Sequence, residues 1–315
     1  ILTFYTFRTL DIRQILDQAP SISGQTINLL GWAGLECHVQ TITMITLFLF
    51  MGCMGKSAQV PFHVWLPYAM EAPTPVSALI HAATMVNAGP FLLVRFSALV
   101  MLSPVAMTVI AIIGGMTALF AAVVALTQTD IKKILAYSTI RQLSYVVLAA
   151  AILSPISVMA AAFHIAAHAF GKITLFLCAG AIYQACGAKC ISEIHGLGRK
   201  LPLTMTAFFI GSLCVIGLPP TGGFVSKWYL LNGSLDSAQQ WAFAVFLTSS
   251  LLNAAYFLPI VYKAFFATPT DQARLDKAKE PPPLTVVPLF ITSAGCVLLF
   301  FFSGKLFQFA NTFAE

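Results

Sequence analysis

Charged residues are scarce in this sequence. Asp, Glu, Lys and Arg make up only 9% of its 315 residues, whereas 58% are hydrophobic. Because soluble domains carry about 25% charged residues, the composition excludes an ordinary soluble protein. It predicts an all-α, polytopic membrane protein surrounded by a lipid bilayer. The formal net charge of +6 then fits positively charged cytoplasmic loops better than nucleic-acid binding, so we expect no nucleic-acid partner.

Redox and cofactor motifs are also missing. The seven cysteines form no C-x-x-C pair, and no glycine-rich loop of the dinucleotide-binding type occurs. We therefore expect no cofactor and no catalytic site of the chain's own. Cys186 and Cys190 bracket a loop, where a disulfide or a bound metal is an alternative. The sequence has no initial methionine either, so we expect a fragment whose natural start lies before Ile1.

Apolar segments long enough to cross a bilayer fill most of the chain. About eight transmembrane helices are predicted, at residues 39–62, 74–100, 105–127, 134–153, 156–184, 202–232, 239–267 and 283–309. Lys and Arg gather in the loops after the third, fifth and seventh segments. The positive-inside rule places these loops in the cytoplasm, and the expected location is a bacterial inner membrane.

Two of the apolar segments are predicted to be broken helices. Gly55, Lys56 and Pro61 interrupt the first segment, and Gly222 and Lys227 interrupt the sixth. Glycine and proline weaken a helix, and a charge at the bilayer centre costs about 2.5–3.5 kcal/mol on insertion scales. Because broken helices near polar groups form the ion sites of many transporters, we predict functional sites at both lysines.

A stripe of titratable residues marks the fifth segment. His164, His168 and Lys172 are spaced by four residues, so they share one face of a helix. His81, in the second segment, is a further group that can exchange protons near neutral pH. These residues predict a proton path. Two alternatives are a zinc site, although the Glu of H-E-x-x-H is missing, and bis-histidine haem ligation by His81 and His164.

Further polar residues lie near the predicted cytoplasmic ends of the segments. Lys132 and Lys133 begin the fourth segment, where a positive helix cap and a proton entry path are alternatives. Glu71 is expected at the cytoplasmic mouth, either as a solvated charge or as an accessory of the path, and Ser138 is a second accessory. Arg141 lies deeper and is expected to meet a carbonyl or an acid from another segment.

Several motifs carry a family resemblance. They are residues 55–67, 71–85, 128–139, 163–172 and 222–227, which occur in the same order as in the family. Together they resemble the antiporter-like subunits of respiratory complex I and of Mrp cation/proton antiporters. The resemblance covers the chain from about Thr9 to Phe307.

The resemblance implies a core of fourteen helices with two inverted five-helix repeats. Residues 1–38 would then hold the end of helix six and a loop, 39–102 the remnant of the first repeat, 103–268 the second repeat, and 269–315 a cytoplasmic loop and the last helix. Carried over by motif, the proton-translocating residues would be Lys56, His81, Lys133, His164, His168, Lys172 and Lys227. The glutamate that pairs with Lys56 in the family would lie upstream of Ile1.

The predicted function is proton or cation translocation through a chain of buried Lys and His residues. Residues 217–223 and 251–266 look closer to Mrp-type D subunits, which favours a subunit of a Mrp-type Na⁺/H⁺ antiporter. The alternative is a proton-pumping membrane subunit of an NADH:quinone oxidoreductase or of a membrane-bound hydrogenase. An electron-carrying subunit and a membrane scaffold are competing hypotheses. The expected partners are other membrane subunits of the same complex.

Overall fold

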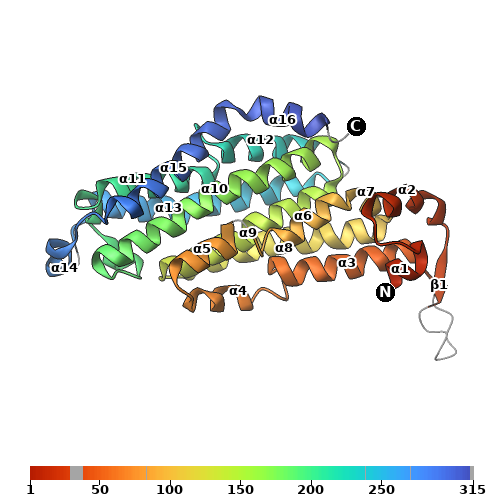
Figure 1. The fold of residues 1–315 in the computed structure, drawn as a ribbon, viewed down its shortest axis with the longest axis horizontal. Coiled ribbons are helices and arrows are strands. Elements are labelled where there is room, and N and C mark those ends of the chain that lie inside the picture. Colours follow the sequence, from red (N-terminus) through yellow and green to blue (C-terminus); the bar gives the residue numbers. More distant parts are fainter. Residues whose placement is uncertain (29–37, 83, 238, 270, 313–315) are drawn as a thin grey trace.

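Helices form nearly all of the described chain, which comprises residues 1–28, 38–82, 84–237, 239–269 and 271–312 of a computed structural model. In chain order they are α1 (Leu2–Phe7), α2 (Ile12–Ile22), α3 (Thr41–Ser57), α4 (Trp65–Tyr68), α5 (Thr74–Ala82), α6 (Ala88–Arg95), α7 (Ser97–Met101), α8 (Pro104–Thr127), α9 (Ile131–Ile152), α10 (Pro155–Cys186), α11 (Pro202–Ile216), α12 (Gly222–Leu235), α13 (Trp241–Phe266), α14 (Gln272–Lys277), α15 (Pro283–Phe301) and α16 (Ser303–Thr312). A two-stranded antiparallel hairpin, β1 (Thr26–Asn28) with β2 (His38–Gln40), lies at the opposite end of the long axis from α14 (Figure 1).

Five of these helices are long and apolar enough to cross a membrane: α8, α9, α10, α13 and α15. The number rises to six if α11 and the short helical turns at Ile191–Arg199, which are bent by 118° relative to each other, form one span. The other predicted segments are divided. The first ends at α3, the second consists of α5 to α7, and the sixth is split into α11 and α12. The chain is therefore an integral membrane protein, and both predicted breaks, near Lys56 and Gly222, are confirmed.

Local sequence explains where the central helices begin and end. The Asp130 carboxylate accepts the backbone N–H of Lys133 at 3.1 Å and caps α9. Helix α11 ends because Gly217 adopts a left-handed conformation, with φ 87°, and its N–H bonds to the Leu213 carbonyl at 2.8 Å. Pro219 and Pro220 follow, so the helix cannot continue.

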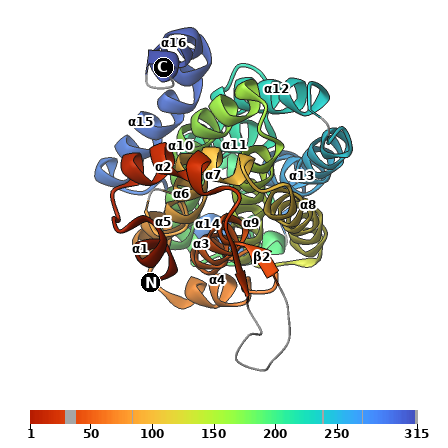
Figure 2. The same ribbon diagram turned by 90° about the vertical axis from the view of Figure 1, so that its right-hand side faces the viewer.

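Helix α9 lies near the middle of the bundle (Figure 2). It is the least apolar of the five spanning helices, yet 94% of its most apolar 18-residue stretch is buried within the protein. Gly114 lets α8 approach closely, since a Cβ at this position would lie 3.1 Å from the Leu148 nitrogen on α9. The polar side chains of α9 are thus held away from lipid and against the neighbouring helices.

The three predicted basic loops meet at one end of the bundle. The Ile131 N–H donates to the Lys189 carbonyl at 3.0 Å, which joins the first loop to the second. The Gly196 N–H donates to the Lys263 carbonyl at 3.2 Å, which joins the second loop to the end of α13. The alternation of basic loops along the sequence therefore corresponds to one face of the structure.

Candidate functional site

The break between α11 and α12 places a lysine in the protein interior. Lys227, on α12, donates from Nζ to the carbonyl oxygens of Val215 (3.0 Å) and Ile216 (2.6 Å), and only 7% of the residue is exposed. These carbonyls end α11, so they lack intrahelical partners and lie at the negative end of the helix dipole. Gly217 leaves room for the lysine, because a Cβ there would lie 2.5 Å from Lys227 Cδ.

The Val215 carbonyl is the centre of a polar cluster that joins four helices. Besides Lys227, it accepts the side-chain amides of Gln142 on α9 at 2.6 Å and Asn253 on α13 at 2.7 Å. A carbonyl freed by the helix break thus receives three donors. The break is therefore held together by buried hydrogen bonds and not by apolar packing alone.

His164 is connected to this cluster through both of its ring nitrogens. Nε2 lies 3.0 Å from Gln142 Oε1, and Nδ1 lies 2.8 Å from Ser226 Oγ, next to Lys227 in the chain. The ring also lies beside Tyr145, with centroids 5.9 Å apart. Since both nitrogens are engaged, His164 is poorly placed to ligate a haem iron. Within the described ranges, no group of three His, Cys, Asp or Glu side chains is placed to hold a metal.

The other half of the stripe meets α5 and the start of α9. Lys172 is fully buried, and its Nζ donates to the Leu135 carbonyl at 2.9 Å. His168 Nε2 lies 3.3 Å from the carbonyl oxygen of His81. The His81 side chain is fully buried and has no hydrogen-bond partner in the described part of the chain. Together with the cluster at Val215, the structure therefore brings together five of the predicted path residues: His81, His164, His168, Lys172 and Lys227.

Helices α9 and α10 run antiparallel, so one polar stripe faces the other. Leu135 contacts Lys172 while Gln142 contacts His164, which places Ser138 between these two levels. Ser138 Oγ, Arg141 Nε and Nη2, and the Tyr256 hydroxyl are buried and make no hydrogen bond of good geometry among the described residues, although Tyr256 interacts more loosely with Ser138 and Arg141. Such atoms are uncommon in proteins and mark places where ordered water or a transient bond completes the network.

Lys56 does not join this cluster, which corrects the expected continuous line of buried groups. It lies in the last turn of α3 and is exposed, and the described residues give it no hydrogen bond. The reason is its position on the helix. Phe48, Gly52 and Lys56 recur every four residues on the exposed face, whereas Cys53 and Ser57 face the bundle.

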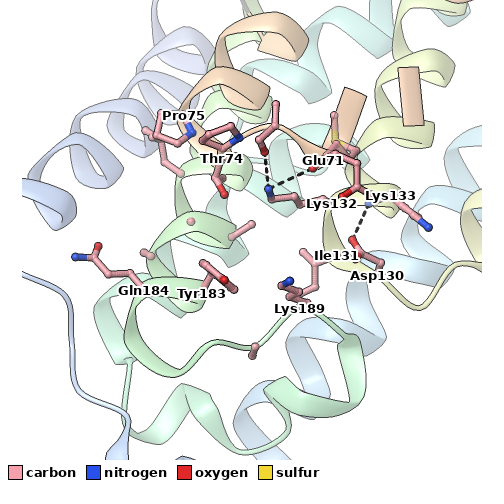
Figure 3. Close-up of a pocket in the computed structure, with 18 of the residues that line it drawn as sticks. Glu71, Thr74, Pro75, Asp130, Ile131, Lys132, Lys133, Tyr183, Gln184 and Lys189 are labelled. Carbon is pink, nitrogen blue, oxygen red and sulfur yellow. Dashed lines mark hydrogen bonds between the residues drawn. The ribbon is translucent and has the colours of Figure 1, made fainter. Parts of the chain in front are cut away.

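The remaining predicted residues gather at an open cavity of about 700 Å³ (Figure 3). Glu71, Lys132 and Lys133 line it. The other lining residues include the start of α5, the last turns of α10 and the first turn of α15. Lys132 Nζ donates to the Ala72 carbonyl at 3.0 Å, so this lysine is anchored at the rim. Leu177, also in the lining, lies five residues beyond Lys172 on α10. The cavity thus opens at the ends of the helices that carry the buried path.

Sequence reasoning missed the neutral residues that connect the path. Three such residues were not predicted: Gln142 binds His164, Tyr145 accepts from Arg141, and Asn253 donates to the Val215 carbonyl that also binds Lys227. A signal was present, because Ser138, Gln142 and Tyr145 recur at intervals of three or four along α9 within an otherwise apolar helix. Arg141 meets the Ser249 carbonyl of α13, as predicted.

Comparisons with known proteins agree with the resemblance. Residues 4–253 match the family model of the NADH:quinone oxidoreductase/Mrp antiporter transmembrane region. NADH-quinone oxidoreductase subunit L of Rickettsia typhi is 44% identical over 270 residues, which cover 85% of this chain and 40% of that protein. The chain thus spans less than half the length of this curated relative.

Two solved structures share the fold. A chain of the Mrp complex from Dietzia sp. is 31% identical with a TM-score of 0.79, over 95% of this chain and 31% of that one. A chain of an archaeal membrane-bound sulfane sulfur reductase has a TM-score of 0.82 at 22% identity, over 98% of this chain and 59% of that one. The fold, the buried lysines and the family match agree, and the chain belongs to the NADH:quinone oxidoreductase/Mrp antiporter transmembrane family.

Proposed function

We propose that this chain is the proton-translocating membrane part of an NADH:quinone oxidoreductase, of the kind represented by subunit L. The similarity to subunit L of Rickettsia typhi, at 44% identity, exceeds the 31% identity to the Mrp complex chain. The sequence motifs alone favour a Mrp-type antiporter subunit. These comparisons instead favour the alternative, a subunit of an NADH:quinone oxidoreductase. The proposed partners are the other membrane subunits of such a complex.

The observation that carries this proposal is the pair of buried lysines held by backbone carbonyls. Lys172 and Lys227 each place Nζ against carbonyl oxygens, and neither meets a carboxylate of the residues that the structure describes. Carbonyl dipoles stabilise the ammonium less than an ion pair does, so each lysine can lose its proton as well as hold it. A lysine with two accessible protonation states inside a membrane is what a proton relay requires.

The side chains between the two lysines are suited to pass a proton. His164 and His168 can each donate from one ring nitrogen and accept at the other. The amide oxygen of Gln142 and the hydroxyl of Ser226 fix the orientation of the His164 ring. The proposed route runs from Lys172 past His168 and His164 to Lys227, with ordered water near Ser138 completing it.

The cavity beside Glu71, Lys132 and Lys133 is the proposed entrance to the route. The basic loops that surround it would face the cytoplasm of a bacterium under the positive-inside rule. His81, on the helix whose Thr74 and Pro75 line the cavity, would take the proton next. Lys56 is proposed to act in a separate site. The glutamate that the family resemblance implies, upstream of Ile1, would complete that site. Residues 103–268, proposed as the second repeat, contain the part of the route from Lys172 to Lys227, whereas Glu71 and His81 lie before it.

The test counts protons moved for each NADH oxidised by the full-length protein within its complex in vesicles. Lys172→Met keeps the length of the side chain and removes the titrating group, so we expect proton translocation through this subunit to stop. Lys200→Met, at an exposed loop lysine, is the matched control and should translocate as the wild type does. Wild-type translocation by Lys172→Met, with assembly intact, would overturn the proposal.

A Mrp-type antiporter subunit is the second candidate, because the Mrp complex chain shares the fold over 95% of this chain. The two functions differ in their driving force. An antiporter subunit moves Na⁺ against a proton gradient without any NADH. Sodium efflux from vesicles that hold a preset pH gradient and no NADH would favour this second function, and its absence would favour the first.

A further inference from the structure

Arg141 is a buried charge whose hydrogen bonds are only partly formed. The residue is fully buried on α9, and its Nη1 donates to the Tyr145 hydroxyl at 2.8 Å and to the Ser249 carbonyl at 3.1 Å. Its Nε and Nη2 make no hydrogen bond of good geometry among the described residues, although the guanidinium also interacts with the nearby Tyr256 hydroxyl. A guanidinium stays protonated in proteins, in contrast to a lysine. Arg141 is therefore a permanent positive charge within the membrane interior.

No carboxylate compensates this charge in the described part of the chain. Every Asp and Glu that the structure describes is exposed or partly exposed, so the buried charged residues are all cationic. Removing a cation from water without a partner is costly. A neutral hydrogen-bonding side chain would serve a purely structural role equally well. We therefore expect the positive charge of Arg141 to have a function.

Arg141 lies between the two buried lysines of the proposed route. On α9, the carbonyl of Leu135 binds Lys172, and one turn beyond Arg141 the ring of Tyr145 faces Lys227. The guanidinium carbon and Lys227 Nζ lie 5.2 and 5.4 Å from the centre of that ring. Arg141 also interacts electrostatically with both lysines. The fixed charge is thus placed to act on both of them.

We propose that Arg141 is a positioning residue whose fixed charge keeps Lys172 and Lys227 from being protonated at the same time. This inference rests on the proposed function. Like charges repel strongly in a low-dielectric interior, so a third cation makes the doubly protonated pair unfavourable. A proton that arrives at Lys172 therefore favours release of the proton from Lys227, and the total charge of the three groups stays at two.

Other titratable groups also face the lysines and shape the same equilibrium. Around Lys172 they are His168 on its own helix and His81 on α5, while Tyr256 on α13 lies beside Arg141. Around Lys227 they are His164 on α10, Tyr145 on α9 and Cys214 on α11. None of these groups carries a permanent charge. Arg141 is the constant contribution against which the others titrate.

The test is the pH profile of proton translocation by the full-length protein in its complex. Arg141→Gln removes the charge and keeps a hydrogen-bonding side chain. Because the lysines then hold their protons more firmly, the alkaline limb of the profile should move up by about one pH unit. The rate near neutral pH should fall several-fold, since release from Lys227 becomes slow. Arg141→Lys supplies a cation that can itself lose its proton, so its profile should lie between those of the wild type and Arg141→Gln.

Three outcomes separate the possibilities. A shifted profile in Arg141→Gln that Arg141→Lys restores at least in part supports the inference. An unshifted profile in Arg141→Gln, or equal loss of assembly in both variants, shows a structural role and overturns it. In the same vesicles Lys172→Met serves as the reference. If that variant blocks translocation while Arg141→Gln is unshifted, the inference fails and the proposed function stands.

Discussion

Two helix breaks in this molecule have similar sequences, but different side chains occupy the buried position at each. Both combine glycine, proline and one lysine. At the break after α11, Lys227 lies beyond the break, on α12, and reaches back to the Val215 and Ile216 carbonyls. At the break after α3, Lys56 lies before the break, on the exposed face of the helix.

A neutral residue takes the inner position at the α3 break. Gln59 is fully buried, donates to the Ser57 carbonyl at 3.2 Å, and accepts the Ser144 hydroxyl of α9 at 2.9 Å. A helix break frees carbonyls that must find donors, and either a cation or an amide can supply them. Only the cation adds a group that can release a proton. The comparison shows that a helix break supplies free carbonyl groups, and that the residue which binds them determines whether the site can exchange a proton.

The largest expected effect in this comparison comes from Gly223→Ala at the α11–α12 break. A Cβ at Gly223 would collide with the backbone carbonyl of Cys214, which cannot move without displacing α11. We expect a loss of about 3 kcal/mol or more in the free energy of unfolding, seen as a lower thermal midpoint in detergent. Gly52→Ala near the α3 break meets no atom within 4 Å and is the matched control. Equal midpoints for the two variants would contradict the contrast in packing.

A smaller effect is expected for Gly217→Ala. The residue has φ 87°, and the new Cβ would lie 2.5 Å from Lys227 Cδ. The left-handed conformation alone costs about 1–2 kcal/mol for alanine, and the lysine must also leave its carbonyls. Gly187→Ala, with φ 69° and no atom within 4 Å, shares the strain but touches no lysine. Proton translocation should fall in the first variant only, and an equal fall in both would show that strain alone is responsible.

The smallest effect is expected at the α3 break, from Ser144→Ala. The variant removes the hydroxyl that donates to Gln59 Oε1, and a typical intramolecular hydrogen bond contributes about 0.5–1.5 kcal/mol to stability. We expect a midpoint slightly below that of the wild type and an unchanged number of protons for each NADH. A strong loss of translocation would show that the α3 break also carries protons through Gln59.

The fold was largely predictable from the sequence, for physical reasons. Glycine and proline weaken helices, and their clustering near Lys56 and Gly222 allowed both interruptions to be predicted, although single prolines such as Pro259 and Pro288 lie inside α13 and α15. Spacing by four residues places side chains on one face in any helix, which predicted the stripe of His164, His168 and Lys172. The structure confirms both features.

The exposure of Lys56 and the cluster at Val215 could not be predicted. In a membrane helix the lipid-facing side is as apolar as the side that faces other helices, so periodicity does not tell them apart. Phe48 on the exposed face of α3 and Phe50 in the core are therefore alike in sequence. The cluster depends on a freed backbone carbonyl, which no side-chain pattern reveals.

The most direct test of the account is the number of protons that the complex moves for each NADH when Lys227 is replaced by Met. Lys227→Met removes the one titrating group that binds the carbonyls of the α11 break, so translocation through this subunit should stop while the complex still assembles. A wild-type proton count in an assembled complex would show that the buried lysine is structural, and it would contradict the account.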